Sequence, residues 1–334
     1  MSKTQTEPEQ LHGIARALLG LLVLLPKNAI SRAMGWLASR RLPGPLQRPL
    51  LALFVRLAGV DRRELARPLA SYDSLQSFFT RALPPGARPL EGGEDVLVSP
   101  CDGAWGASGR IEGGTILQVK GRPYRVADLL GSEEAARPFE GGTFATLYLS
   151  PRDYHRFHAP TAGRITRLVY RPGNLWPVNA IGLLGVEGVF ARNERICAWL
   201  EIEPGTGTGT GISTRIGDGV AGEPTSMAGD TAAAGQGAAA HSIAMIAVGA
   251  TMVGSVRLAF DGLRTNRAGA VAVDRALGAL GPKLARGEEW GHFEFGSTIV
   301  LLIPPGLFTL DAQAIGTPLR LGRAIGRRTN LEIR

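Results

Sequence analysis

Short runs of β-type residues separated by turns dominate the chain after Ala70. Such runs combine Val, Ile, Leu and Thr and are flanked by turn residues, which is typical of strands. The 45 glycines and 22 prolines supply turns and close backbone contacts. We therefore expect an α+β fold with a β-rich body. The expected strands are 95–99, 115–120, 143–149, 164–169, 195–202, 243–248, 251–258 and 297–303, with helical patches at 74–81 and 126–130.

Residues 1–70 form a basic, apolar region that precedes this body. The region holds eleven basic and four acidic residues, so +7 of the total net charge of +8 lies in the first fifth of the chain. Two segments, 11–25 and 49–60, interleave leucine with arginine, and the uninterrupted apolar stretch 17–25 is far below the ~20 residues that span a bilayer. We expect amphipathic helices that lie in a membrane interface. Core helices of a soluble domain are the alternative.

The N-terminal charge pattern narrows the class of partner. A basic surface suits anionic lipid or nucleic acid, and no aromatic-basic or nucleic-acid motif accompanies it, so lipid is favoured. Glu7 and Glu9 precede the apolar stretch and no clear cleavage site follows, which disfavours a signal peptide. The second domain, 71–334, is then the catalytic body.

We expect no catalytic or metal site from two other features of the chain, a Gly-rich segment and the two cysteines. Residues 205–240 are rich in Gly, Ala and Thr, cannot bury enough surface to fold by themselves, and are expected to be a flexible insertion between two strands. Cys101 and Cys197 form no metal-binding spacing and no disulfide framework, so we expect small buried residues in a reducing compartment.

Candidate acid–base groups are concentrated in two short segments. His155 and His158 lie three residues apart and could share a helical face or the ends of a tight turn. Asp102 precedes Gly103 after an expected strand, where a carboxylate can orient a histidine. Structural histidines and an ordinary turn aspartate are the alternatives. A metal site is disfavoured because HExxH and a third ligand are missing.

The pair Gly296-Ser297 is the third candidate feature. Thr298 and an apolar strand follow it directly. A glycine before a serine lets the backbone bend, so that the serine hydroxyl can attack the preceding carbonyl in an N→O acyl shift. A routine turn into a strand is the alternative.

Several ordered motifs resemble one known family. They are FFTRAL (78–83), GARP (86–89), VSPCDG (98–103), YLSPRDYHRFH (148–158), FARNER (190–195), VGATMVGS (248–255) and GST (296–298), the last preceded by a KLARGEE stretch at 283–289. These motifs are similar to the signature blocks of bacterial membrane-associated phosphatidylserine decarboxylases, and they cover most of residues 70–310. The one small departure is Cys101, where alanine or valine is commoner.

The resemblance implies self-cleavage at Gly296-Ser297. A β chain of residues 1–296 and an α chain of 297–334 would result, with Ser297 converted into a pyruvoyl cofactor. By resemblance, His158 takes the hydroxyl proton, Asp102 holds the imidazole, and Thr298 donates to the oxyanion.

The resemblance also implies the reaction of the mature enzyme. The pyruvoyl group forms a Schiff base with phosphatidylserine, CO2 leaves, and phosphatidylethanolamine is released. His155 is the matched position for protonating the carbanion, with water or His158 as rivals. No pyridoxal phosphate and no metal are implied, and no nucleic acid partner. The enzyme would be peripheral on the cytoplasmic side of the cell membrane. Its oligomeric state stays open, a homodimer included.

Three further residues are candidates for substrate binding. Arg192 and Arg195 could bind phosphate or carboxylate, or could equally form structural ion pairs. Asn179 is a further pocket candidate. Two other functions compete with the resemblance: a serine hydrolase that uses Ser297, His158 and Asp102 on external substrates, and a membrane scaffold that never cleaves.

Overall fold

The computed structural model describes residue 20 and residues 25–117, 123–202, 241–251, 255–294 and 297–329. Three sequence predictions therefore lie wholly or largely outside the described residues: the apolar segment 11–25, the insertion 205–240, and Gly296. Among the described residues, no helix has the length and apolar character needed to cross a bilayer.

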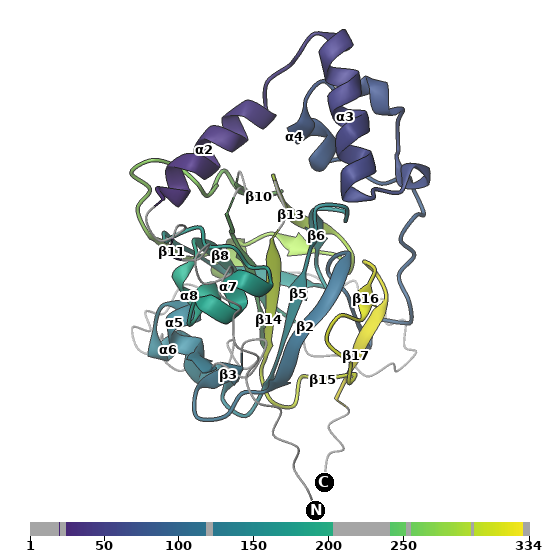
Figure 1. Ribbon diagram of the computed structural model, residues 1–334. Coiled ribbons are helices and arrows are strands. Elements are labelled where there is room, and N and C mark those ends of the chain that lie inside the picture. Colours follow the sequence, from purple (N-terminus) through teal and green to yellow (C-terminus); the bar gives the residue numbers. More distant parts are fainter. Residues whose placement is uncertain are drawn as a thin grey trace, which may run out of the picture.

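A large antiparallel sheet organises the body (Figure 1). In the described part of the chain it has nine strands in the order β11-β7-β8-β9-β14-β5-β2-β16, with β12 also paired to β7. Their bounds are β2 Gly103–Arg110, β5 Thr143–Tyr148, β7 Gly163–Arg171, β8 Arg195–Glu201, β9 Ser242–Val248, β11 Val273–Ala276, β12 Lys283–Leu284, β14 Thr298–Ile303 and β16 Pro318–Leu319.

The centre of this sheet is buried along its whole length. Every residue of β9 and β14 is buried, as are the first six residues of β8. Continuous apolar runs of this kind fill a sheet that is covered on both faces. Strand β14 hydrogen-bonds to β5 on one side and to β9 on the other, with Thr298 opposite both Tyr148 and Val248. The first residue of β14 is therefore fixed in the middle of the sheet.

Smaller sheets lie against this centre. Strands β10, β13 and β6 form one, β1, β17 and β15 another, and β3 pairs with β4. Phe157 of β6 packs on Trp290 and Phe293 of β13 inside the main core. The bounds are β1 Val96–Val98, β3 Thr115–Leu117, β4 Pro123–Arg125, β6 Arg156–His158, β10 Val256–Leu258, β13 Glu289–Phe293, β15 Phe308–Leu310 and β17 Ala324–Arg328.

Short helices cover part of the body. Figure 1 places α5, α6, α7 and α8 on one flank of the large sheet. Their bounds are α5 Val126–Leu130, α6 Glu133–Ala136, α7 Ala180–Gly185 and α8 Val189–Arg192, and the 3-10 turns are η1 Arg62–Glu64, η2 Leu69–Ser71, η3 Arg137–Phe139 and η4 Gly278–Leu280.

The N-terminal helices gather at the end of the body where β6, β10 and β13 lie (Figure 1). They are α2 Lys27–Ala38, α3 Gly44–Ala58 and α4 Leu75–Phe79. Leu51 and Val55 of α3 pack with Tyr72 and Phe78 in a small apolar cluster of their own. The helix predicted at 49–60 is confirmed, but it begins earlier, after Pro43, whose fixed φ suits a helix start.

Most predicted strands are confirmed within a residue or two. The strand predicted at 251–258 was given too early a start. Thr251 is in a turn, and β10 begins only at Val256. The sequence also gave no sign of β2, which is unusual for its glycines. A Cβ on Gly103 would lie 2.2 Å from the Tyr148 carbonyl oxygen, so glycine is what lets β2 approach β5 here.

Candidate active site

Ser297 lies immediately before β14, whose first residue, Thr298, pairs with Tyr148 at the end of β5. Its side chain is fully buried, and its carbonyl oxygen accepts a hydrogen bond of 2.8 Å from Leu149 N–H. Among the residues that the structure describes, neither the Ser297 Oγ nor the Oγ1 of the buried Thr298 has a hydrogen-bond partner. Buried hydroxyls are normally paired, so two unpaired ones at adjacent positions indicate a site built for chemistry.

His155 ends the loop that follows β5. Its Nδ1 lies 2.8 Å from the Asp153 carbonyl oxygen, and Phe79 stacks against the ring at 4.0 Å between centroids. Because a carbonyl only accepts, Nδ1 carries the proton and Nε2 presents a lone pair. That Nε2 is buried and unpaired. Burial, and then the nearby Arg81 guanidinium, lower the pKa of His155 to about 3, so the ring is a neutral base.

His158 has partners on both ring nitrogens. Nδ1 donates to the Gly287 carbonyl at 2.9 Å, and Nε2 lies 3.2 Å from the Tyr154 hydroxyl, which therefore donates to it. Burial lowers the pKa of this ring as well. His155 and His158 lie on an extended segment at β6, so the shared helical face considered from the sequence is wrong.

Asp102 is buried but does not hold His158 through a hydrogen bond. Its carboxylate accepts from Arg88 Nε at 2.9 Å and from Leu321 N–H at 2.8 Å, and Arg88 in turn bonds Glu64 at 2.7 Å. The direct Asp102–His158 contact expected from the resemblance is therefore not formed here, because a guanidinium occupies the carboxylate. The Asp102 charge still raises the His158 pKa, as the smallest of several influences.

The site thus includes residues that sequence reasoning missed. Arg88 and Tyr154 contact the predicted catalytic side chains directly, and Arg81 lies beside His155. All three fall inside motifs that were noted for their resemblance alone, GARP, YLSPRDYHRFH and FFTRAL. The signal that could have found these three residues is a polar side chain inside a motif that resembles the family.

The three predicted substrate-binding residues are dispersed. Arg195 is buried and donates to the carbonyls of Asp128, Leu129, Ala191 and Asn193, so backbone hydrogen bonds hold its guanidinium instead of the ion pairs considered from the sequence. Arg192 is exposed at the end of α8.

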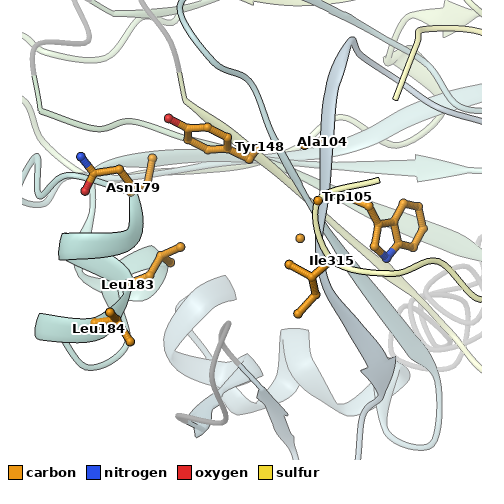
Figure 2. A pocket seen from close by; sticks show the side chains of 10 residues that line it. Ala104, Trp105, Tyr148, Asn179, Leu183, Leu184 and Ile315 are labelled. Atoms are coloured by element: carbon orange, nitrogen blue, oxygen red, sulfur yellow. The ribbon is translucent and has the colours of Figure 1, made fainter. Parts of the chain in front are cut away.

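Asn179 caps α7, with its side-chain oxygen accepting from Ile181 N–H at 3.2 Å. It also lines a cavity of about 260 Å³ between α7 and strands β2 and β5 (Figure 2). Leu183 and Ile315 face each other across this mostly apolar space. Tyr148 lines it too and pairs with Thr298, so the cavity opens on the sheet face that carries the Thr298 side chain.

Within the ranges that the structure describes, no group of three or more His, Cys, Asp or Glu side chains could hold a metal ion. The polar site consists instead of a serine, a threonine, two histidines and buried arginine and aspartate side chains.

Fold and site together define the class: an α+β enzyme with a buried serine at the head of a central strand. The sequence model of the family described as phosphatidylserine decarboxylase matches residues 75–225 and 223–327. Relatives named phosphatidylserine decarboxylase proenzyme include one from Anaeromyxobacter sp. (strain K), 39% identical over 93% of this chain and 98% of the relative, and one from Verminephrobacter eiseniae, 40% identical over 91% and 95%. The chain belongs to the phosphatidylserine decarboxylase family.

Proposed function

We propose that this chain converts phosphatidylserine into phosphatidylethanolamine and CO2, using a pyruvoyl group that it generates from its own Ser297. The observation that carries the proposal is the buried, unpaired Ser297 Oγ at the start of β14, inside the region that matches the family. The neighbouring unpaired atoms, Thr298 Oγ1 and His155 Nε2, fit a site in which a new carbonyl and a bound substrate supply the missing partners.

The chain's own residues would carry out self-cleavage. Ser297 Oγ attacks the Gly296 carbonyl carbon, and its proton passes to a histidine, giving an ester and a free amine. Loss of the Ser297 Cα proton expels the Gly296 carboxylate, and water hydrolyses the resulting dehydroalanine to the pyruvoyl group and ammonia. Thr298 Oγ1 has no competing acceptor, so it is available to donate to the oxyanion.

His158 is the base that we propose for the Ser297 hydroxyl. For this role its Nε2 must exchange the Tyr154 hydroxyl for that of Ser297. Asp102 would support the imidazolium through its charge rather than through a hydrogen bond, since Arg88 occupies its carboxylate. Among the described residues, His155 Nε2 has no partner, and the ring is buried in its neutral form, which suits a group that meets the substrate.

When formed, the pyruvoyl carbonyl supplies an electron sink for the bond that breaks as CO2 leaves. His155 would then deliver a proton to the substrate carbon from Nε2, having first accepted that proton, because Nδ1–H is held by Asp153. The fully buried surroundings exclude bulk water from this transfer.

Self-cleavage would leave the fold intact. The α chain, residues 297–334, contributes β14, which pairs with both β5 and β9 of the β chain. Strands β15, β16 and β17 of the α chain also pair with each other or with β1 and β2. A cut before Ser297 therefore breaks the covalent chain while the sheet holds the two products together.

We further propose that residues 1–70 attach the enzyme to the cytoplasmic side of the membrane and that 71–334 form the decarboxylase domain. Helix α3 supports this, because Leu46, Leu50, Leu53 and Leu57 repeat at helical spacing and are all exposed. Trp36 and Leu37 of α2 are exposed as well. An apolar helical surface within a strongly basic segment suits the interface of an anionic membrane.

Intact-mass spectrometry and gel electrophoresis of the purified chain and of Ser297→Ala test the proposal. The wild type should yield an α fragment of about 4 kDa, in proportion to 35.3 kDa for 334 residues, with a blocked N-terminus. Ser297→Ala should remain one chain and release no CO2 from phosphatidylserine. A Ser297→Ala variant that still decarboxylates the lipid would exclude the pyruvoyl mechanism. An uncleaved wild type that hydrolyses esters would favour the serine hydrolase.

A further inference from the structure

Arg81 is a buried arginine whose hydrogen bonding is incomplete. Its side chain is 4% exposed, and its Nη2 donates to the carbonyls of Arg152 at 3.2 Å and Asp153 at 3.3 Å. Nε and Nη1 are buried and have no partner in the described part of the chain, which leaves three N–H bonds unused. Burial lowers the pKa of this guanidinium, so leaving it unpaired is unfavourable.

Arg195 provides an internal comparison. It is the only other buried arginine among the described residues, with the same 4% exposure, and all three of its nitrogens donate to backbone carbonyls. Among the described residues, none of the electrostatic neighbours of Arg81 accepts a hydrogen bond from its Nε or Nη1; these neighbours are Tyr72, Asp102, Glu64 and Asp153. Arg81 is therefore a buried cation with donors to spare, which is what a site for an external anion requires.

The position of Arg81 places that anion beside the reactive groups. The Asp153 carbonyl oxygen accepts from both Arg81 Nη2 and His155 Nδ1, so the guanidinium and the imidazole flank one atom. Phe79, two residues before Arg81, stacks on His155. The same loop starts at Leu149, whose N–H binds the Ser297 carbonyl.

Two anionic groups on the proposed substrate could meet Arg81: the serine carboxylate and the phosphodiester. A guanidinium on the carboxylate would stabilise the charge that decarboxylation must remove, and so would oppose the reaction. The phosphodiester keeps its charge throughout, so binding it costs nothing in the chemical step. Resting on the proposed function, we propose that Arg81 binds the phosphodiester of the phospholipid headgroup through its unpaired Nε and Nη1.

The surroundings of Arg81 connect it to the N-terminal helices through packed aromatic side chains. Phe78 packs under the Arg81 guanidinium at 5.0 Å and also against Phe54 of α3 at 6.0 Å. Helix α3 carries the exposed leucine row on a neighbouring face. Helix α4 thus joins the apolar helices to the loop that holds His155, and Arg81 is the cation at the end of that path.

Binding of an anion there would also change His155. The Arg81 charge is the second cause, after burial, of the low His155 pKa. A phosphodiester on Arg81 offsets that charge, which raises the proton affinity of Nε2 when substrate is present. Arg81 is thereby a binding residue that also tunes the proposed proton donor.

The test compares the mature wild type with Arg81→Gln, Arg81→Lys and the control Arg152→Gln, which removes an exposed charge from the same loop. Dihexanoyl phosphatidylserine and phosphatidylethanolamine, used as monomers, are the probes. Calorimetric titration gives their dissociation constants, and kinetics on the serine lipid gives KM and kcat. Arg81→Gln should weaken binding of both lipids by a similar factor, about 10- to 100-fold, as expected for a charged hydrogen bond. Arg81→Lys should recover part of the loss, and Arg152→Gln should change little.

Phosphatidylethanolamine distinguishes binding of the phosphodiester from binding of the carboxylate, because it has the first group and lacks the second. Weaker binding of the serine lipid alone would overturn the proposal in favour of the carboxylate, and unchanged binding of both would show that Arg81 is a structural cation. If Arg81→Gln is not processed or does not fold, Arg81→Lys must show the raised KM, and a normal KM overturns the proposal. A wild type that binds both lipids but never cleaves would contradict the proposed function and leave the Arg81 comparison valid.

Discussion

Ser297, Thr298 and His155 each bury a polar atom that lacks a hydrogen-bond partner. An unpaired buried hydroxyl costs about 1–3 kcal/mol relative to one that is bonded. A fold tolerates such a cost where the atoms serve chemistry, so these three atoms support the proposed reactive centre more strongly than any single motif does.

Thr298→Val separates the chemical from the structural role of that hydroxyl. Because Oγ1 is unpaired, its loss in a Ser297→Ala background should leave the free energy of unfolding unchanged or raise it by ~1 kcal/mol. In the wild-type background, self-cleavage should slow by about 10²–10³-fold, as when an oxyanion donor is removed. Denaturant melts and gel time courses measure the two effects.

Thr146→Val is the matched control, since Thr146 lies on β5, is also buried, and donates to the Ala107 carbonyl at 2.9 Å. It should lose about 1–3 kcal/mol by leaving that carbonyl unpaired, without a specific effect on cleavage. Equal destabilisation by the two variants would mean that Thr298 is paired in solution. Unchanged cleavage in Thr298→Val would remove it from the mechanism.

We expect the two histidines to act in different steps, His158 in self-cleavage and His155 in decarboxylation. His158→Ala should stop self-cleavage, because the base for Ser297 is gone, and the protein should remain one chain. His155→Ala should still cleave but lose most CO2 release, by about 10²–10⁴-fold. The reverse pattern on gels and in CO2 assays would exchange the two roles. His155 could also accept the Ser297 proton, because its Nε2 has no partner among the described residues.

At the residue scale, sequence reasoning identified the buried polar side chains of the proposed site but not their partners. Asp102, His155, His158 and Ser297 were all predicted, and all four are buried. The sequence did not predict the role of Arg88, because its ion pairs with Asp102 and Glu64 join residues that only the folded chain brings together. A turn aspartate in a sequence has no visible partner, so its neighbour could only be guessed from resemblance.

At the element scale, apolar runs located the central strands, whereas the glycines of β2 concealed that strand. Strands β5, β8, β9 and β14 follow the predicted runs closely, because a buried central strand is a continuous apolar segment. Strand β2 holds Gly103, Gly106 and Gly109, and its pairing depends on space beside β5. A pattern of small residues does not show that tight approach until the partner strand is known.

Helix α3 supports a prediction of its own. Leu53→Gln with Leu57→Gln should reduce binding to anionic vesicles at least tenfold, because each leucine buried in the interface contributes about 1.5–3 kcal/mol. Leu57 is 76% exposed, so the fold should be unaffected. Co-sedimentation measures binding, and self-cleavage reports folding. Leu280→Gln, on a surface turn of the body, is the control for losing an exposed leucine. Undiminished vesicle binding by the α3 variant would exclude this face as the anchor.

At the scale of the whole molecule, the proposed catalytic centre lies where two apolar clusters meet. The main core contains β14, and the separate cluster of α3 and α4 reaches the site through Phe78 and Phe79. The proposed cleavage before β14 would place the new chain end at this junction without freeing a strand, because β14 stays paired with β5 and β9.

Burying two neutral histidines there should make the whole fold sensitive to mild acid. The His155 pKa falls from 6.5 to about 3 on folding, so between these values the unfolded chain binds more protons and stability decreases as pH falls. In a Ser297→Ala background, burial of neutral His155 alone should lower the free energy of unfolding by roughly 2–3 kcal/mol as pH falls from 6.5 to 4.5, at about 1.4 kcal/mol per pH unit. His158 acts in the same direction, whereas burial raises the pKa of Glu194 and opposes it. Urea melts of this protein and of the same protein with His155→Gln measure the difference. The glutamine variant should lose less stability over this range, and parallel losses in both would mean that His155 is not buried in the neutral form.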